Sequence, residues 1–271
     1  MTGAHEVRPA PGPDQPPVPV RLVTFNTHHG VGEDARHDLP RLAKVLASVD
    51  ADVICLQEVD RYFGDRSEDV DQALLLSRAL DMQLAWGPAI DEPRPGDRPP
   101  RQYGNALLSR LPILISDVHG LPGSGEPRSA LRTMLELDGS TLWVTATHLT
   151  TRSPEERAEQ VAALAALHTP DMAAGVLVGD FNTRPGAPEL EPLRERFTDA
   201  WELAVDRGDQ AGWRFWQREE GHTHPAHAPH RRIDQAWVSA GVAVAGARVL
   251  DAEGASDHLP LMVDLLVPSG V

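Results

Sequence analysis

Side chains capable of acid–base or metal-binding chemistry follow several of the apolar, strand-like runs in this sequence. The run VLVGDFN ends with Asp180 and Asn182, which lie two positions apart. In an extended segment such residues point the same way, so both can face one bound group. A carboxylate can take a proton from water, whereas an amide can donate a hydrogen bond without repelling an anion. The chain has three asparagines, and the other two, Asn26 and Asn105, also lie at or inside strand-like runs.

The same pattern recurs elsewhere, with Glu58 after ICLQ, His148 after VTAT, Asp234 within RIDQAWVS, and Asp257 and His258 just before the last apolar run. Strand ends and the loops beyond them are where α/β scaffolds usually present their sites. Together these residue types suit hydrolysis of a phosphate ester, which needs a cation, an activated water and donors to the phosphoryl oxygens. Taken singly, each position is equally compatible with a surface charge, a turn or a strand-edge histidine.

The hydrophobic pattern predicts an α/β domain. Strands are expected at residues 20–26, 52–59, 104–110, 140–149, 175–182, 232–239 and 260–267. Apolar residues at helical spacing predict helices over 38–49, 70–82 and 153–168. The last helix has Ser153 before Pro154 and Glu156 three positions on, which is the pattern of a capping box. Near-continuous apolar strands such as VICL indicate sheets that are covered on both faces.

Composition disfavours several classes of protein. The chain has 271 residues and a formal net charge of −15, from 25 basic and 40 acidic side chains. A field of that sign repels nucleic acid, although a bound divalent metal can invert it locally. The single cysteine, Cys55, excludes an intrachain disulfide and a cysteine-rich zinc site.

The organisation of the chain points to one domain. Residues 1–19 are rich in proline and glycine, and we expect a disordered tail there, followed by a catalytic domain over 20–271. No apolar run has the character of a signal peptide or the length of a membrane span. We therefore expect a cytoplasmic protein, and a monomer.

Seven segments, taken in order, resemble the endonuclease/exonuclease/phosphatase superfamily: TFNTHHG, LQEVD, YGNALLSR, THL, GDFN, RID and SDHLP. The first begins at residue 24 and the last ends at residue 260, almost the whole chain, and their order is far more specific than any one of them. This superfamily includes pancreatic-type deoxyribonucleases, exonuclease III-type nucleases, neutral sphingomyelinases and inositol polyphosphate 5-phosphatases. The resemblance implies a four-layer α/β sandwich, in which two mixed β-sheets pack face to face with helices on the outside and the site at one rim.

The resemblance also implies a divalent metal, Mg²⁺ or Mn²⁺. Glu58 would be the principal ligand, with Asn26 and Asp257 near the ion. A carboxylate is the hard oxygen ligand that Mg²⁺ prefers, and this ion typically takes only one or two of them.

The remaining motif residues would act on water and phosphate. By resemblance, Asp180 orients and deprotonates the attacking water, and Asn182 donates to the phosphoryl group or holds that water. His258, oriented and kept cationic by Asp234, would donate to the scissile phosphate. His148 would be a second phosphate donor or an acid.

Candidate substrate contacts are Arg66 in DRSEDVDQ, Asn105 in YGNALLSR, Arg128 in EPRSALR, and His224 and Arg232 in GHTHPAHAPHRRID. The segment ATHLT has His148 where exonuclease III-type enzymes have tyrosine and asparagine, which argues against the abasic-site branch. With the negative charge, this favours a phosphorylated small molecule, nucleotide or lipid headgroup as substrate. A metal-dependent endonuclease and a catalytically silent binding module are the alternatives. The histidine-rich loop, with His222, His224, His227 and His230, also leaves open a second metal, because imidazole suits transition metals.

Overall fold

The computed structural model describes residues 16–169, 174–206 and 220–269. One sheet contains, in spatial order, β11 (Ala243–Val249), β12 (Leu261–Val267), β1 (Val18–Asn26), β2 (Val53–Arg61), β4 (Arg101–Ser109) and β3 (Gln83–Glu92). The other contains β5 (Ile113–Leu121), β6 (Arg128–Leu137), β7 (Ser140–His148), β8 (Gly175–Asp180), β10 (Asp234–Ser239) and β9 (Phe197–Asp199). Both sheets are mixed, because β1–β2 and β7–β8 are parallel pairs and the other neighbours are antiparallel.

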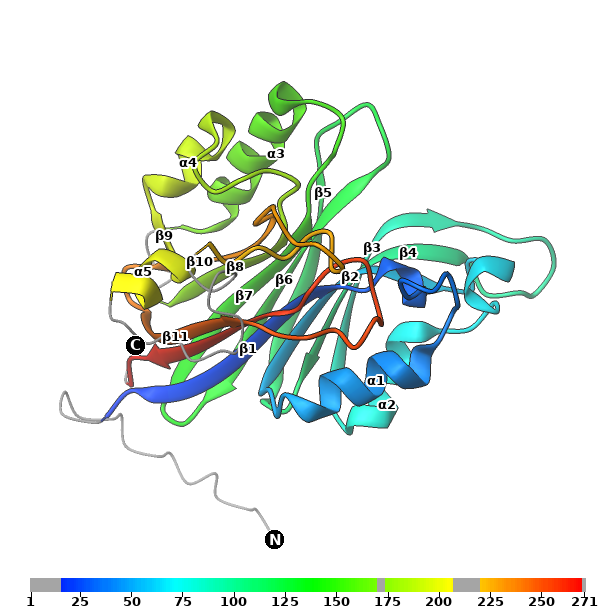
Figure 1. Ribbon diagram of the computed structural model, residues 1–271, viewed down its shortest axis with the longest axis horizontal. Coiled ribbons are helices and arrows are strands. Elements are labelled where there is room, and N and C mark those ends of the chain that lie inside the picture. The colour runs from blue at the N-terminus through cyan, green and yellow to red at the C-terminus, as the bar shows by residue number, and fades with distance from the viewer. Residues whose placement is uncertain (1–15, 170–173, 207–219, 270–271) are drawn as a thin grey trace, which may run out of the picture.

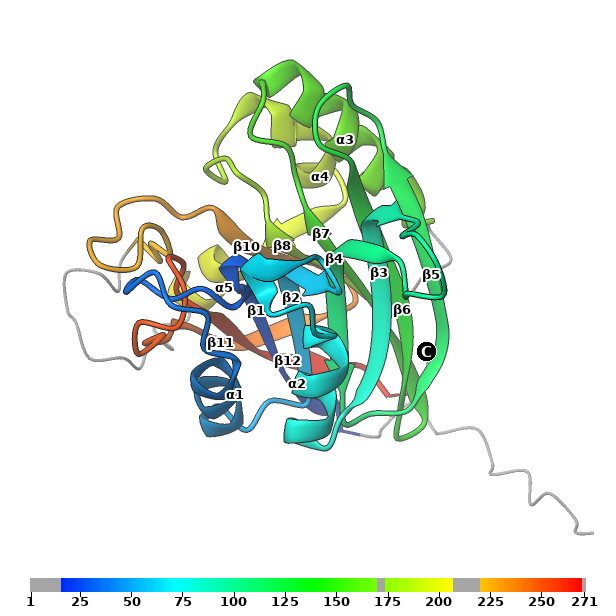
Figure 2. The same cartoon turned by 90° about the vertical axis from the view of Figure 1, so that its right-hand side faces the viewer.

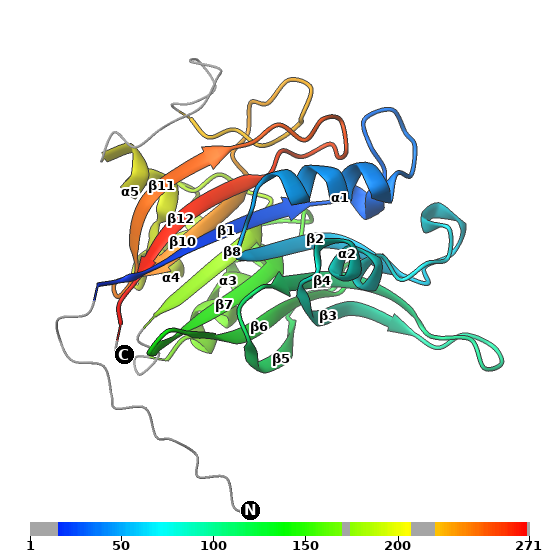
Figure 3. The same ribbon diagram turned by 90° about the horizontal axis from the view of Figure 1, so that it is seen from below.

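Helices cover the outer face of each sheet (Figures 1 and 2). The helices are α1 (Leu39–Ser48), α2 (Gln72–Leu80), α3 (Pro154–Leu167), α4 (Glu191–Arg194) and α5 (Ala200–Asp206), with short 3-10 turns η1 (His28–Gly30), η2 (Asp65–Ser67) and η3 (Pro188–Leu190). Figure 3 shows α1 and α2 over the first sheet and α3 and α4 behind the second. The predicted four-layer α/β sandwich is therefore confirmed. Within the described ranges, none of these helices combines the length and the apolar character needed to cross a bilayer.

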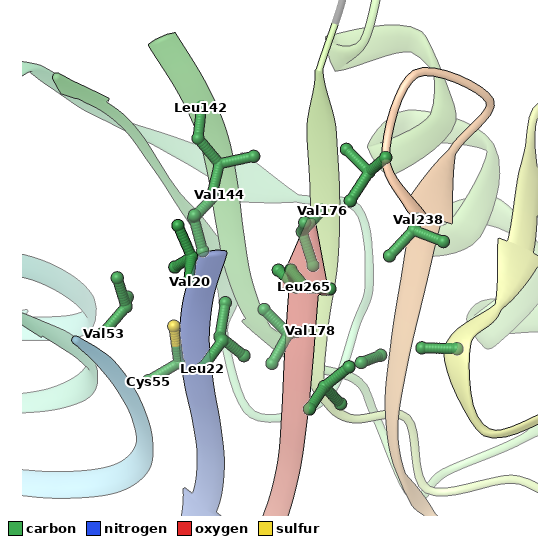
Figure 4. Packing of buried hydrophobic residues seen from close by; sticks show 14 of the residues in the cluster. Val20, Leu22, Val53, Cys55, Leu142, Val144, Val176, Val178, Val238 and Leu265 are labelled. Atoms are coloured by element: carbon green, nitrogen blue, oxygen red, sulfur yellow. The ribbon is translucent and has the colours of Figure 1, made fainter. Parts of the chain in front are cut away.

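The main core lies between the two sheets. Val20, Leu22 and Leu265 of the first sheet meet Val178 and Val238 of the second, and all are buried (Figure 4). Burying each such side chain contributes roughly 1.5–3 kcal/mol, so these contacts hold the two sheets face to face. The functional side chains lie on both sheets, so this packing positions them relative to one another.

Each outer layer has its own apolar cluster. Leu42 and Leu46 of α1 pack on the first sheet beside Phe25, and Leu164 of α3 packs on the second sheet beside Trp237. Leu42 and Leu46 belong to the apolar face that the helical spacing predicts for residues 38–49. The predicted cap of α3 is also present, since the hydroxyl of Ser153 accepts a hydrogen bond from the backbone N–H of Glu156 at 3.2 Å.

The seven predicted strands and three predicted helices are confirmed, apart from small shifts at their ends. The sequence pattern missed β3, β5, β6, β9 and β11. In β3, Gly87 and Pro88 are untypical of a strand, so the pattern does not predict one. Proline is tolerated there because β3 is the edge strand of its sheet. One boundary needs correction: β1 begins at Val18, which pairs with Val267, so the expected tail over 1–19 overlaps the strand. Residues 1–15 lie outside the described part of the chain.

A buried histidine behind the second sheet makes stability sensitive to acid. His168 follows α3, and its Nε2 lies 2.9 Å from the hydroxyl oxygen of Thr145. Burial, together with the positive charges of Arg132 and Arg196, lowers the pKa of His168 to about 4. The unfolded chain then binds this proton more readily than the folded one, so the contribution to stability is complete above the unfolded pKa and is lost as pH falls toward 4.

We therefore expect His168→Gln to flatten the pH dependence of stability. Relative to wild type, the loss of unfolding free energy between pH 7 and pH 5 should shrink by up to about 2 kcal/mol. Urea denaturation at the two pH values measures this change, with the exposed His227→Gln as a control. An unchanged difference between pH 7 and pH 5 would show that His168 is not the responsible group.

Candidate active site

The functional side chains meet where the carboxyl ends of β1 and β2 approach the carboxyl ends of β7 and β8. Asn26, the last residue of β1, joins the two sheets. Its Nδ2 donates to Glu58 Oε1 at 3.0 Å on the first sheet and to Asp180 Oδ2 at 3.1 Å on the second. Its own Oδ1 accepts from the backbone N–H of His28 at 3.0 Å. One buried amide thus sets the spacing between the carboxylates of Glu58 and Asp180.

A bulge in β2 aims Glu58 into the site. The register against β4 shifts between Leu56 and Val59, and Glu58 has a left-handed φ of 57°. Such a bulge re-aims a side chain out of the regular alternation of a strand. The Oε2 atom of Glu58 lies 3.8 Å from His29 Nδ1. Although burial alone would raise the pKa of Glu58, the interactions with His29 and Asn26 outweigh it and hold that pKa well below its ordinary value.

Asp180 and Asn182 lie together at the end of β8. The backbone N–H of Asn182 donates to Asp180 Oδ1 at 2.9 Å, and its Nδ2 donates to the carbonyl of Leu149 at 2.9 Å. Asn182 has a φ of 52°, so a turn brings it back beside Asp180. Burial, with the negative charge of Asp234 adding to it, raises the pKa of Asp180 to about 7. A carboxylate with that pKa can accept a proton efficiently near neutral pH.

Gly179 lets Asp180 sit at this position. Its φ is +148°, and a Cβ atom there would lie 1.9 Å from the backbone oxygen of Thr147, its partner on the parallel neighbour β7. We expect Gly179→Ala to lower the free energy of unfolding by at least about 3 kcal/mol, because backbone strain and a backbone clash act together. Chemical denaturation checks this, with Gly186→Ala as the control, since the described part of the chain leaves open space around Gly186. Equal stability of the two variants would contradict the prediction.

His258 and Asp234 form a buried ion pair. His258 Nδ1 lies 2.8 Å from Asp234 Oδ2, and His258 Nε2 lies 3.8 Å from Asp180 Oδ2. Burial alone would favour neutral imidazole, but the charge and hydrogen bond of Asp234 raise the pKa of His258 to about 10. The ring is therefore cationic at neutral pH and presents an N–H toward the reacting centre. The other carboxylate oxygen of Asp234 has no hydrogen-bond partner among the described residues.

His148 has the opposite character. Its Nδ1 lies 3.0 Å from Arg128 Nη1, and its Nε2 lies 3.0 Å from Asn182 Nδ2 and 3.5 Å from Asp180 Oδ2. Burial, reinforced by the charge of Arg128, lowers the pKa of His148 to about 3. The ring is neutral at physiological pH. Of the two roles expected for His148, this environment favours the hydrogen-bond donor over the charged acid.

The oxygen atoms around Glu58 fit a hard divalent cation. Glu58 is ionised, Asp257 is partly exposed, and the Oδ1 atom of Asn26 can accept a second contact. Two oxygens of Asp257 lie near imidazoles, Oδ1 at 3.8 Å from His28 Nδ1 and Oδ2 at 3.9 Å from His224 Nε2. A further buried group consists of Asp180, Asp234 and His258. It contacts Asn26 through Asp180, whose Oδ2 accepts from Asn26 Nδ2.

Of the histidine-rich loop, His224 joins a group that could hold a metal ion, together with Asp257 and His258. His222 pairs with Glu220, and His227 lies near Glu33. The ring of His224 contacts that of His258 at a tilt of 51° with centroids 4.6 Å apart, and its Nδ1 lies 2.7 Å from Arg231 Nη2. A guanidinium can only donate, so the hydrogen of the neutral His224 ring is on Nε2, the atom that a metal at Asp257 would need. His224 thus contacts the site as a hydrogen-bond donor.

The other predicted substrate contacts divide into two groups. Arg128 contacts the site through His148. Asn105 lines a small pocket together with Tyr103 and His148. The Nδ2 atom of Asn105 is, however, committed to the backbone carbonyl of Ser129 at 3.0 Å.

The two remaining arginines are held by carboxylates. Arg66 donates to both oxygens of Asp60, at 2.8 and 2.7 Å, and lies over the ring of Phe63. Arg232 donates to Asp199 on β9.

Sequence reasoning missed several residues of this site. The motif TFNTHHG contains His28 and His29, but the sequence alone does not indicate that they lie beside Asp257 and Glu58. Arg231 was overlooked as well. The signal for the two histidines was their position directly after a strand that ends in Asn26, whereas nothing local identifies the partner of Arg231.

Comparison with known proteins identifies the family of this chain. The sequence model of the endonuclease/exonuclease/phosphatase family matches residues 23–258, and the chain belongs to this family. A protein of Escherichia coli K12 named YbhP is 27% identical over 259 residues, which cover 90% of this chain and 95% of YbhP. A crystal structure of an endonuclease/exonuclease/phosphatase from Beutenbergia cavernae matches with a TM-score of 0.71 and 26% identity, over 93% of this chain and 72% of that one. A mannosyl-6-phosphatase from Bacteroides thetaiotaomicron shares the fold, with a TM-score of 0.70 and 17% identity over 91% of this chain and 99% of that one.

Proposed function

We propose that this protein is a divalent-metal-dependent phosphoesterase that hydrolyses a phosphate mono- or diester by direct attack of water. Its substrate would be a phosphorylated small molecule, a nucleotide or a lipid headgroup. The observation that carries this proposal is the bridge through Asn26, which holds the carboxylate of Glu58 and the carboxylate of Asp180 on either side of one amide. One carboxylate is kept ionised, as a metal ligand must be, and the other has the raised pKa of a base.

The protein's own residues account for the steps on water and phosphate. Asp180 takes a proton from the attacking water through Oδ2, while the backbone N–H of Asn182 holds Oδ1 in place. His258 directs a cationic N–H, and His148 and Asn182 direct neutral N–H groups, at the oxygens of the phosphoryl group. Donors fixed before the reaction stabilise the charge that develops there without reorganisation.

Glu58, Asp257 and Asn26 would hold the metal. Mg²⁺ or Mn²⁺ bound there supplies positive charge that neutralises the phosphoryl oxygens. The environment of Glu58 supports this assignment, because nearby histidines and the amide of Asn26 hold the pKa of its carboxyl well below the ordinary value.

The charge of the chain favours a small substrate over a nucleic acid. The net charge is −15, and the guanidinium of Arg66 is neutralised by Asp60. An endonuclease would need cationic contacts along a phosphate backbone, and its rate would fall steeply as salt rises. Plasmid cleavage with that salt dependence would therefore favour the nuclease alternative.

A substrate panel tests the proposal. A model phosphomonoester, a model phosphodiester, plasmid DNA and sphingomyelin are each incubated with Mg²⁺ and with Mn²⁺, with and without a chelator. We expect hydrolysis of at least one ester that the chelator abolishes. Hydrolysis that survives the chelator would contradict the metal assignment, and no hydrolysis under any condition would support a silent binding module.

A further inference from the structure

The two sides of the His148 ring both face hydrogen-bond donors. On one side, Arg128 Nη1 lies 3.0 Å from Nδ1, and on the other, Asn182 Nδ2 lies 3.0 Å from Nε2. A neutral imidazole carries one N–H and one lone pair, so it can accept from only one of these donors. The structure therefore contains a choice between two tautomers of His148, and each tautomer leaves a different contact unsatisfied.

The chemistry of the two donors decides this choice. A guanidinium has five N–H groups and no acceptor, so Nδ1 can meet Arg128 only with its lone pair. The Asn182 amide cannot turn around to accept from His148, because its nitrogen donates to the carbonyl of Leu149 at 2.9 Å. Hydrogen bonds from a charged donor are roughly twice as strong as those between neutral groups. The contact with Arg128 is also buried, whereas the contact with Asn182 is only partly buried. The contact with Arg128 therefore prevails.

We propose that Arg128 is a positioning residue that holds His148 in the Nε2–H form and so prevents His148 and Asn182 from satisfying each other. Two donors, His148 Nε2–H and Asn182 Nδ2–H, are then left side by side with their nitrogens 3.0 Å apart, and His148 Nε2 lies 3.5 Å from Asp180 Oδ2. Converging donors of this kind are what an anionic oxygen requires. The occupant that fits them is a phosphoryl oxygen of the substrate, and this part of the inference rests on the proposed function.

The opposite tautomer of His148 would remove this pair of free donors. With the hydrogen on Nδ1, Nε2 would accept from Asn182, and the pair would no longer present two N–H groups to a substrate. The Nδ1–H group would also point at the guanidinium of Arg128. His258 shows the contrasting arrangement, because its Nδ1 faces a carboxylate, Asp234, which accepts a hydrogen bond from it.

The tautomer can be measured without any turnover. In the full chain labelled with ¹⁵N-histidine, long-range ¹H–¹⁵N spectra show which ring nitrogen of each histidine carries hydrogen, and His148→Gln assigns the signal. We expect His148 to carry hydrogen on Nε2 in wild type and in Arg128→Lys, which retains a charged donor. In Arg128→Met we expect hydrogen on Nδ1, since the ring can then accept from Asn182.

Activity gives the second readout. On whichever ester the panel identifies, Arg128→Met should lower kcat/KM by about a hundredfold, the usual effect of disabling an oriented donor, and Arg128→Lys should recover most of it. Arg132→Met is the matched control, because Arg132 lies on the same strand but pairs with Asp117 at 3.0 Å. Thermal melts show which variants fold.

The outcomes separate the two proposals. An Nδ1–H tautomer in wild type, or the same tautomer in wild type and folded Arg128→Met, would overturn the role of Arg128. If Arg128→Met does not fold, the wild-type and Arg128→Lys spectra still decide. An Nε2–H tautomer in a protein that hydrolyses nothing would support the positioning role and contradict the phosphoesterase function.

Discussion

Replacing Asp180 by asparagine should lower kcat by about a thousandfold or more while the protein remains folded. Asparagine has nearly the same shape but cannot accept a proton from water. Its stability should stay near that of wild type, because removing a buried charge stabilises the fold while one amide N–H now faces the donor Asn26 or Asn182. The combination of lost turnover and retained stability is specific to a catalytic carboxylate.

Steady-state kinetics on the ester found by the panel, together with a thermal melt, measure both effects. Asp91→Asn is the matched control, since Asp91 lies exposed on β3, and it should behave as wild type in both assays. Turnover by Asp180→Asn within about tenfold of wild type would remove Asp180 from the role of base.

Glu58→Gln should uncouple the protein from its metal. Wild type should become more stable as Mg²⁺ or Mn²⁺ is added, by about 2.7 kcal/mol at a hundred times the dissociation constant, and this gain should largely disappear in the variant. At fixed metal concentration, kcat/KM should fall by at least about a hundredfold. A neutral amide of the same size cannot replace the ionised carboxylate as the principal hard ligand.

Thermal shifts over a metal titration give the first quantity, and kinetics over the same titration give the second. Glu68→Gln is a closely matched control, because Glu68 also has a left-handed φ, 55° against 57° for Glu58, but lies in an exposed turn beside His37. Any effect of the left-handed backbone should appear in both variants, whereas loss of metal response should appear only in Glu58→Gln. An equal metal response in wild type and Glu58→Gln would place the metal elsewhere.

Short-range patterns in the sequence were enough to predict seven strands and three helices, whereas the four-layer sandwich and the roles of the site residues were implied by the family resemblance. Apolar runs such as VICL and VLV predicted buried strands, and the helical spacing predicted α1, α2 and α3, because each pattern depends only on near neighbours. Asp180 and Asn182 lie together beside His148 Nε2, but not in the extended segment that the sequence pattern predicts. The strand ends at Asp180, and a left-handed turn at Asn182 brings the two together.

The tertiary structure decided which of these polar residues are charged and which are engaged elsewhere. Arg128 and Arg232 look equivalent in the sequence, yet one contacts His148, 20 residues away, and the other contacts Asp199, 33 residues away. Three histidines at the site differ for the same reason. Asp234 raises the pKa of His258, whereas burial, reinforced by nearby positive charges, lowers the pKa values of His148 and His224.

This division has a simple physical origin. Secondary structure follows from side-chain patterns a few positions apart, which the sequence contains directly. The charge state of a buried group follows from desolvation and from the partners that packing brings within a few ångströms. Those partners come from both sheets, so the sequence determined which residues stand at the strand ends, and only the packing of β1 and β2 against β7 and β8 decided what each of them can do.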